Sequence, residues 1–134
     1  MIAVDTNVIV RLLVQDDAKQ AASAASLFEA SQIWIAKTVI LETSWVLVSV
    51  YRYPDESVRE ALTKLIGLPN VRVEDETSVT AALALGAKGL DFADALRLTS
   101  KPQGIRFSSF DQAFVRRAQK AGVAEAEILS AKTF

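Results

Sequence analysis

The sequence predicts an α/β fold, a three-layer α/β/α sandwich around a small parallel sheet. Short apolar segments, such as IWI at 33–35 and VRV at 71–73, are typical of strands. Longer periodic or alanine-rich stretches separate them and are typical of helices. Because strands that alternate with helices cannot pair as hairpins, we expect them to pair in parallel through right-handed crossovers.

The first half of the chain is expected to contain two strands and four helices. The apolar run at 1–4 predicts a buried strand, 6–14 a short helix, the alanine-rich stretch 18–31 a second helix, and 33–35 the next strand. Thr38 is a suitable N-cap for a long helix to about residue 52, which Pro54 ends before a helix at 55–66.

The second half continues the alternation. Its expected elements are a strand at 71–73, helices at 77–87 and 92–99, a strand at 105–107, a helix at 112–121 and a weak strand at 126–128. Pro102 stops the helix before it. Since no linker or repeat interrupts the 134 residues, we expect a single domain over 1–134.

Composition excludes several classes of site. The chain has no cysteine and no histidine, which removes disulfides, zinc–thiolate sites, Ser-His-Asp triads and histidine-ligated metals. A net charge of −1 argues against nucleic-acid binding by bulk phosphate neutralisation. The sequence shows no long apolar span and no secretory signal in MIAVDTNVIV, so we expect a cytoplasmic protein.

Five acidic side chains fall where a parallel sheet gathers its functional residues. Asp5 follows the first strand directly, and Asp111 lies just after the point, near 107–109, where the strand that begins at 105 is expected to end. Asp91 and Asp94 start a helix, and their spacing of three places them on nearly the same face. Glu42 lies in the first turns of the helix after the second strand. The carboxyl ends of parallel strands share one edge, so these acids could converge there.

Each acid also has a structural interpretation. Asp5, Asp91 and Asp111 could cap the helices that follow them. Glu42 lies too far inside its helix to cap it, and its neighbours in VILETSWVLVSV are apolar, although Lys37 could pair with it. Several carboxylates in one pocket repel one another, by roughly 4 kcal/mol per pair at 4 Å. Without histidine, a hard cation such as Mg²⁺ or Mn²⁺ is the natural counter-ion.

Four segments, MIAVDTNVIVRLLV, ILETSWVL, GLDFADALRL and FSSFDQAF, resemble the acidic motifs of the PIN domain in the family's order. The likeness is greatest to VapC-type toxins of toxin–antitoxin pairs. It implies a PIN-like fold, with Asp5, Glu42, Asp94 and Asp111 as the catalytic, metal-binding acids. Asp91 matches an additional acidic position, and Thr6, Asn7 and Ser109 match positions that support the acids.

The resemblance implies a Mg²⁺- or Mn²⁺-dependent endoribonuclease. Water activated by the metal would attack the phosphodiester and leave a 5′-phosphate and a 3′-hydroxyl. Single strands or loops are the expected RNA, because a shallow groove does not read the narrow major groove of duplex RNA. The substrate would be held by basic side chains, which could equally be solvated surface charges: Arg11, Arg97, Arg116, Arg117 and Lys120.

Partners are implied by the resemblance alone. Relatives commonly form homodimers, and a small antitoxin protein would block the site. Trp45, Tyr51 and Tyr53 lie on or after the long helix that begins near Thr38, in the region through which relatives commonly pair, and we interpret them as core rather than interface.

Two other classes compete with this interpretation. A haloacid-dehalogenase-like phosphatase would need a second aspartate near Asp5, where Thr6 and Asn7 stand, and a receiver domain would need paired early acids and a late lysine. A non-catalytic PIN-like module, serving as an RNA-binding or regulatory partner, would usually lack one of the four acids. All four are present, so the nuclease remains the preferred function.

Overall fold

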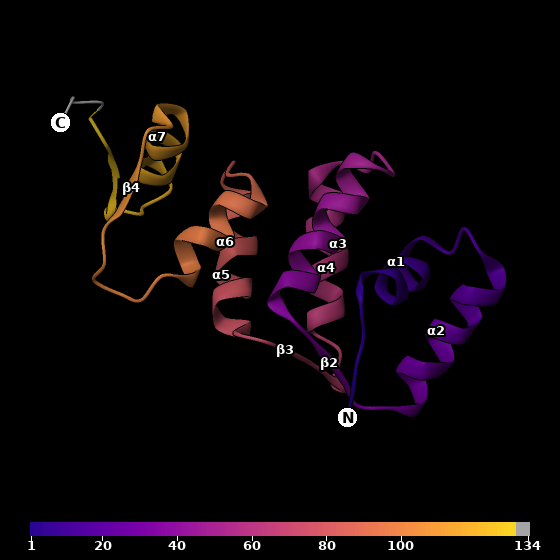
Figure 1. Ribbon diagram of the computed structural model, residues 1–134. Helices are drawn as coiled ribbons and strands as arrows, with labels where there is room; N and C mark the ends of the chain where they lie inside the picture. Colours follow the sequence, from indigo (N-terminus) through magenta and orange to yellow (C-terminus); the bar gives the residue numbers. More distant parts are fainter. Residues whose placement is uncertain (131–134) are drawn as a thin grey trace. The chain divides into compact units, whose positions relative to one another are not determined.

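The computed structural model describes residues 1–130 and divides the chain into two compact units, Met1–Glu76 and Thr77–Phe134 (Figure 1). Each unit has its own small parallel sheet. Among residues 1–130, no helix is both long enough and apolar enough to cross a membrane.

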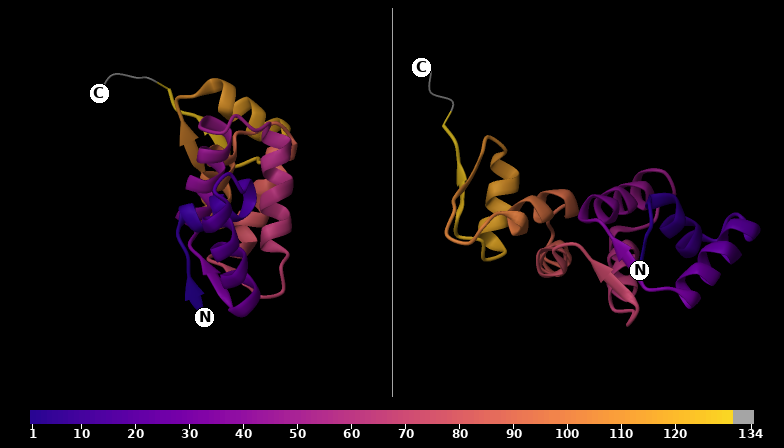
Figure 2. Two further views of the ribbon diagram at one scale, coloured as in Figure 1. Left: turned by 90° about the vertical axis from the view of Figure 1, so that its right-hand side faces the viewer. Right: turned by 60° about the horizontal axis from the view of Figure 1, so that its bottom comes forward.

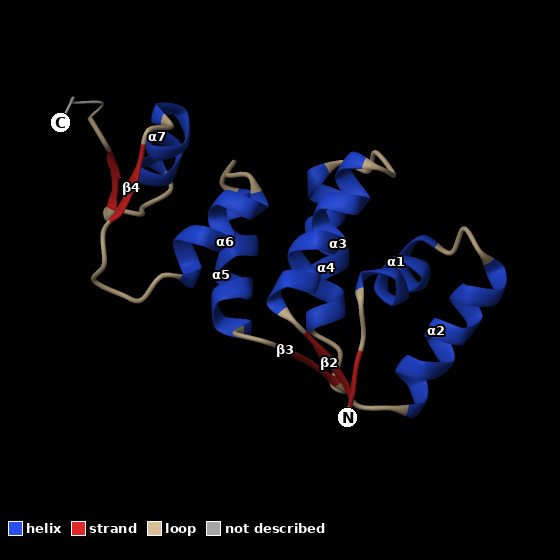
Figure 3. Cartoon of the chain, in the orientation of Figure 1, coloured by secondary structure: helices blue, strands red, loops and turns tan. Residues whose placement is uncertain are grey.

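The N-terminal unit is built on three parallel strands in the order β1 (Ile2–Ala3), β2 (Ile33–Ile35) and β3 (Val71–Val73). Ile2 pairs with Ile33, and Ile33 pairs with Val71, so β2 is the central strand. Figure 3 shows these strands in red, with the chain leaving each of them toward a helix. Parallel pairing aligns the carboxyl ends of the strands, and Asp5 lies just beyond the end of β1.

Four helices complete this unit: α1 (Thr6–Val14), α2 (Ala18–Ala30), α3 (Lys37–Ser49) and α4 (Asp55–Ile66). α1 packs against α2 and α3, and α3 packs against α4 (Figures 1 and 2). The core between helices and sheet is aliphatic, with its largest fully buried side chains at Ile9, Ile33, Ile35, Ile40, Leu62 and Val71. This packing fixes α1, which Asp5 caps, and α3, whose second turn carries Glu42.

The C-terminal unit contains α5 (Glu76–Ala87) from its second residue on, α6 (Phe92–Ser100), β4 (Phe107–Ser109), α7 (Gln112–Lys120) and β5 (Ala126–Ile128). β4 and β5 pair in parallel, and α7 packs on β5 (Figure 3). Ser78 and Thr99 exchange two hydrogen bonds of 3.0 and 2.8 Å through their hydroxyls and main-chain carbonyls, which join α5 to α6.

The predicted α/β class and the parallel pairing of the strands are confirmed. The strands form a sheet of three and a sheet of two, one in each unit, where the sequence predicted one small sheet. Strands of two or three residues form few hydrogen bonds with each partner. Their sequences therefore do not specify which strands belong to the same sheet. The single domain over 1–134 stays a prediction, and its last four residues lie outside the described ones.

Two strand predictions need correction. The strand at 1–4 was expected to be buried, but β1 is an edge strand and Ile2 is 42% exposed. The strand predicted at 105–107 is observed at 107–109, because pairing with β5 sets Phe107 opposite Ala126. Apolar character located both strands approximately, whereas the partner strand decides which residues are paired and covered.

The start of α3 also differs from its prediction. Thr38 is exposed and does not cap the helix, which begins at Lys37 after Ala36 with no cap from its own N-cap side chain. Glu74, just after β3, accepts a 2.9 Å hydrogen bond from the Lys37 amide through Oε1. A distant carboxylate therefore satisfies a donor that the sequence assigned to a local cap.

Candidate acidic active site

Asp5 caps α1. Its backbone is extended, and its Oδ1 accepts a 3.2 Å hydrogen bond from the amide of Val8. Among residues 1–130, no hydrogen bond reaches its other carboxylate oxygen, and the residue is exposed. A carboxylate offers two oxygens with about four acceptor sites, so capping leaves capacity for a cation.

Asp91 and Asp111 are likewise the N-caps of α6 and α7. Asp91 Oδ2 accepts from the Asp94 amide at 3.2 Å, and Asp111 Oδ1 accepts from the Phe114 amide at 3.0 Å. The structural interpretation of all three capping acids is therefore correct. It does not exclude a second role, since each aspartate uses one oxygen for its cap.

Asp94 has the most perturbed carboxylate of the set. Its Oδ1 lies 2.7 Å from Nη1 of Arg97, one turn along α6. Burial raises the pKa of Asp94, and the negative charge of Asp91 raises it further; Arg97 lowers this pKa, and Asp111 adds a smaller upward contribution. The net result is a raised pKa, so the Asp94 carboxyl is harder to ionise than that of an ordinary aspartate despite the nearby Arg97.

Glu42 does not occupy the buried position that the sequence suggested. It is exposed on α3, although Thr43 and Ser44 beside it are buried. Lys37, the alternative partner, pairs through Nζ with Asp75 at 3.0 Å. The argument from burial for a metal at Glu42 is thus wrong, because an apolar helix has more than one face and only one of them is covered.

The acids divide between the two units. Asp5 and Glu42 belong to the N-terminal unit, and Asp91, Asp94 and Asp111 to the C-terminal one. The latter three are near enough for Asp91 and Asp111 to shift the pKa of Asp94. Even so, residues 1–130 contain no group of three acids, histidines or cysteines placed to hold a metal ion. A complete four-acid centre is therefore not shown.

The predicted supporting residues behave differently from one another. Ser109 Oγ accepts a 3.0 Å hydrogen bond from the Asp111 amide and so holds the backbone of that acid. Thr6 is buried, and within the described chain its hydroxyl has no hydrogen-bond partner. Thr43 Oγ1, next to Glu42, is likewise buried and unpartnered there. Each of the two candidate ligands, Asp5 and Glu42, is thus followed in sequence by a buried hydroxyl without a partner among residues 1–130. Such a hydroxyl costs folding free energy, which a segment with only a structural role would not need.

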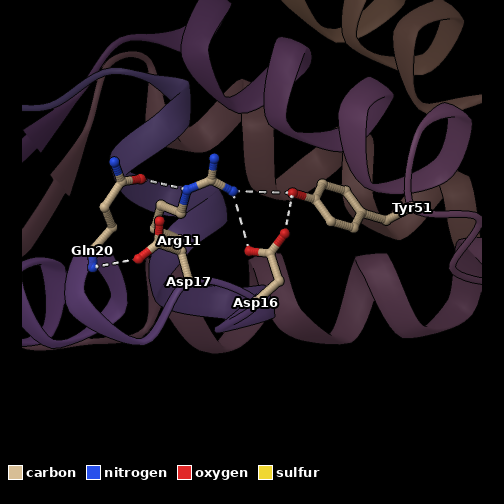
Figure 4. A network of polar contacts seen from close by, with 5 residues as sticks. All are labelled: Arg11, Asp16, Asp17, Gln20 and Tyr51. Atoms are coloured by element: carbon tan, nitrogen blue, oxygen red, sulfur yellow. Dashed lines mark hydrogen bonds and ion pairs between the residues drawn. The ribbon is translucent and has the colours of Figure 1, made fainter.

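Arg11 belongs to a network of polar contacts that the sequence did not reveal (Figure 4). Its Nε donates to Gln20 Oε1 at 2.6 Å, and its Nη1 donates to Tyr51 Oη at 3.2 Å and Asp16 Oδ1 at 3.1 Å. The Tyr51 hydroxyl in turn donates to Asp16 Oδ2 at 2.9 Å. The Tyr51 bond, and then the charge of Asp16, raise the pKa of Arg11.

The other predicted RNA-binding cations are more exposed. Arg116, Arg117 and Lys120 lie exposed on α7, where Arg116 makes one long contact of 3.5 Å with Gln112. Arg97 is exposed while it pairs with Asp94. Their surface positions agree equally with RNA contact and with solvated charge.

A groove lies beside Asp5 in the N-terminal unit. It has a volume of about 370 Å³ and runs between α1 and α2, lined by Asp5, Asn7, Val8, Arg11, Gln20, Ser23, Ala24 and Leu27. Thus Asn7, predicted as a supporting residue, and Arg11, predicted to bind substrate, share a concave surface with the first acid. Gln20 and Ser23 were missed, because nothing in the alanine-rich stretch 18–31 distinguishes them.

The interpretation of the three aromatic residues as core is wrong in part. Trp45 is 62% exposed on α3, and Tyr53 is 41% exposed. Tyr51 is half-buried, but it serves the Arg11 network through its hydroxyl. The hydrophobic content of the α3 sequence alone does not predict which face of the helix is buried and which is exposed to solvent.

Comparison with protein families gives one finding. A model of the PIN domain matches residues 2–120, well over half of the chain. The chain belongs to the PIN-domain family. PIN domains are typically nucleases and typically use divalent metals. Searches among curated proteins and among solved structures returned no significant match.

Proposed function

We propose that this PIN-domain protein is a divalent-metal-dependent endoribonuclease and the toxin of a toxin–antitoxin pair. The observation that carries the proposal is the family match over 2–120, which spans all four candidate acids. The environment of Asp94 supports it: burial and then the charge of Asp91 raise the pKa of this carboxyl, and a bound cation would stabilise the ionised carboxylates.

The donor set suits Mg²⁺ or Mn²⁺. All the candidate ligands are carboxylates, and the three capping aspartates each retain an oxygen that accepts no hydrogen bond from residues 1–130. In the proposal, Asp5, Glu42, Asp94 and Asp111 hold the metal within a single domain, and Asp91 stands beside them. When bound, the metal supplies an activated water and stabilises charge on the phosphate.

The chain's own residues supply the remaining functions. Because there is no histidine, a carboxylate of the acidic set or a second water must accept the proton. Ser109 holds Asp111 in place through the amide hydrogen bond. Arg116, Arg117 and Lys120 on α7 are proposed to contact phosphates of single-stranded or loop RNA, for which their exposure is required.

The partners are part of the same proposal. The exposed Trp45 and Tyr53 give the region at and after α3 an apolar surface suited to a homodimer. A small antitoxin protein would cover the acidic site. A cytoplasmic location, where cellular RNA is abundant, belongs to the same proposal.

A non-catalytic PIN-like module is the alternative function. It is favoured by the Asp94–Arg97 ion pair, in which a guanidinium already neutralises one candidate ligand. Such a module would bind RNA without cutting it and would not need a metal.

Cleavage of a mixed RNA pool distinguishes these functions. Transfer RNA, ribosomal RNA and a single-stranded oligonucleotide are incubated with the protein in Mg²⁺ or Mn²⁺, with a chelator and with the Asp94→Asn protein. The nuclease predicts cuts that end in a 5′-phosphate and disappear in both controls. RNA that is bound and left intact in every metal would support the module instead.

A further inference from the structure

The groove between α1 and α2 contains two hydrogen-bond donors that are held in place and not used. Arg11 Nε–H can only donate, so the Gln20 atom it meets must be the amide oxygen. That assignment leaves the Gln20 amide nitrogen as a donor. Asp17 Oδ1 accepts from the Gln20 backbone amide at 3.0 Å, which also fixes the start of α2.

Arg11 provides the second donor. Its Nε and Nη1 are committed to Gln20, Asp16 and Tyr51, whereas its Nη2 donates to none of the residues 1–130. Figure 4 shows Nη2 of Arg11 and the amide nitrogen of Gln20 on the same side of the network, pointing away from Asp16 and Asp17. An arginine held by three acceptors loses little further rotamer freedom when it binds a ligand.

The rest of the groove suits a flat ligand with polar edges. Val8, Ala24 and Leu27 give it apolar walls, and Ser23 and Asn7 add polar groups. Its volume of about 370 Å³ lies at the small end of the range for ligand pockets, roughly 300–1,000 Å³. Asp5 lies at the same groove, so an RNA strand at the acidic site could place a neighbouring base here.

We propose that this groove is a nucleobase subsite that selects guanine next to the scissile phosphate. Guanine presents two acceptors, O6 and N7, on one edge, and these match the donors of Arg11 and Gln20. Adenine offers a donor at N6 in place of the acceptor O6. Since Arg11 occupies the Gln20 oxygen, Gln20 cannot form its usual two-bond pair with adenine. The inference rests on the proposed function, because it assigns a specificity to that site.

The test uses a substitution that changes one donor into an acceptor. Gln20→Glu keeps an oxygen for Arg11 and removes the N–H that would meet guanine. Gln103→Glu is the matched control, because it adds the same charge at an exposed residue outside the groove. Both are made in the full-length Asp94→Asn chain, so that binding is measured without cutting.

Fluorescence anisotropy would report the affinity for single-stranded oligonucleotides that differ only in one central base. We expect about tenfold tighter binding of guanine than of adenine, the scale of a matched pair of base contacts. The preference should fall to about twofold or less in Gln20→Glu, and persist in Gln103→Glu. Replacing the guanine by 7-deazaguanine should also weaken binding, because it removes N7.

Equal affinity for all four bases, or a guanine preference that Gln20→Glu leaves intact, would overturn the subsite and leave the groove as surface for a protein partner. The unmodified chain is assayed for RNA cleavage in parallel. Cleavage without base preference would refute the subsite alone. A guanine preference that depends on Gln20, in a chain that cuts no RNA, would support the subsite and refute the nuclease.

Discussion

Arg97 Nη1 lies 2.7 Å from Asp94 Oδ1, yet the pKa of Asp94 remains above that of an ordinary aspartate. Burial, Asp91 and Asp111 together outweigh the arginine. The ion pair on one helix therefore does not make Asp94 an ordinary carboxylate. A divalent cation would favour its ionised form against burial and against the charge of Asp91, so Asp94 is the most informative residue for experiment.

Asp94 should make folding stability depend on pH. Its folded-state pKa is raised, so the folded protein binds the proton more tightly than the unfolded chain does. The stabilising contribution is present below the unfolded pKa, near 3.8, and is lost as pH rises through the folded pKa. Asp94→Asn should consequently raise the melting temperature at pH 7 relative to the parent, and the difference should vanish near pH 3. A parent that is the more stable at pH 7 would contradict this electrostatic balance.

Mn²⁺ should stabilise the parent protein. A ligand that binds only the folded state adds about 2.7 kcal/mol at 100 times its Kd, so the melting temperature should rise by several degrees. Asp94→Asn and Glu42→Gln should each reduce the rise, which differential scanning fluorimetry would measure. Glu76→Gln, an exposed acid at the start of α5, is the matched control and should retain it. An equal rise in all four proteins would indicate non-specific metal binding.

Two substitutions of Asp5 should separate its cap from its proposed ligand role. Asp5→Asn keeps an oxygen for the Val8 amide and should change the free energy of unfolding by only a few tenths of a kcal/mol. Asp5→Ala removes the cap and should cost about 1 kcal/mol. Both should lose Mn²⁺-dependent stabilisation, which chemical denaturation with and without metal would show. Retention of the metal effect in Asp5→Asn would restrict Asp5 to capping.

The Tyr51 hydroxyl should contribute to stability through its contacts with Arg11 and Asp16. Tyr51→Phe removes this hydroxyl and keeps the ring, and should cost about 1 kcal/mol of unfolding free energy. Tyr53→Phe is a suitable control, since Tyr53 is exposed and its hydroxyl makes no hydrogen bond among residues 1–130. Urea unfolding would compare the two; equal effects would show that the network adds nothing to the fold.

Local signals predicted the helices well. The N-cap Asp5 and the apolar spacing after it gave α1 at its observed bounds, Thr6–Val14, because both signals lie within the segment itself. The start of α4 followed in the same way from Pro54 and from Asp55 and Glu56 after it. Each of the capping aspartates could also be recognised from its place before a helix.

Features set by distant residues could not be predicted. The cap of α3 comes from Glu74, thirty-seven positions away in sequence, so Thr38 was a misleading local candidate. The exposure of Glu42 depends on which face of α3 is covered, and the apolar run around it does not specify that face. The Arg11 network joins residues 11, 20 and 51, whose proximity only the packing of α1, α2 and α3 creates.

The central claim is that this PIN domain cuts RNA with a metal held by its acids. The most direct measurement is the rate of RNA cleavage in Mg²⁺ for the parent, Asp94→Asn and Asp5→Asn proteins, with a chelator beside each. We predict that the chelator abolishes cutting, and that each substitution lowers the rate by about a hundredfold or more, the scale of losing one transition-state charge contact. Cutting that survives the chelator, or that both variants retain at the parent rate, would contradict the claim.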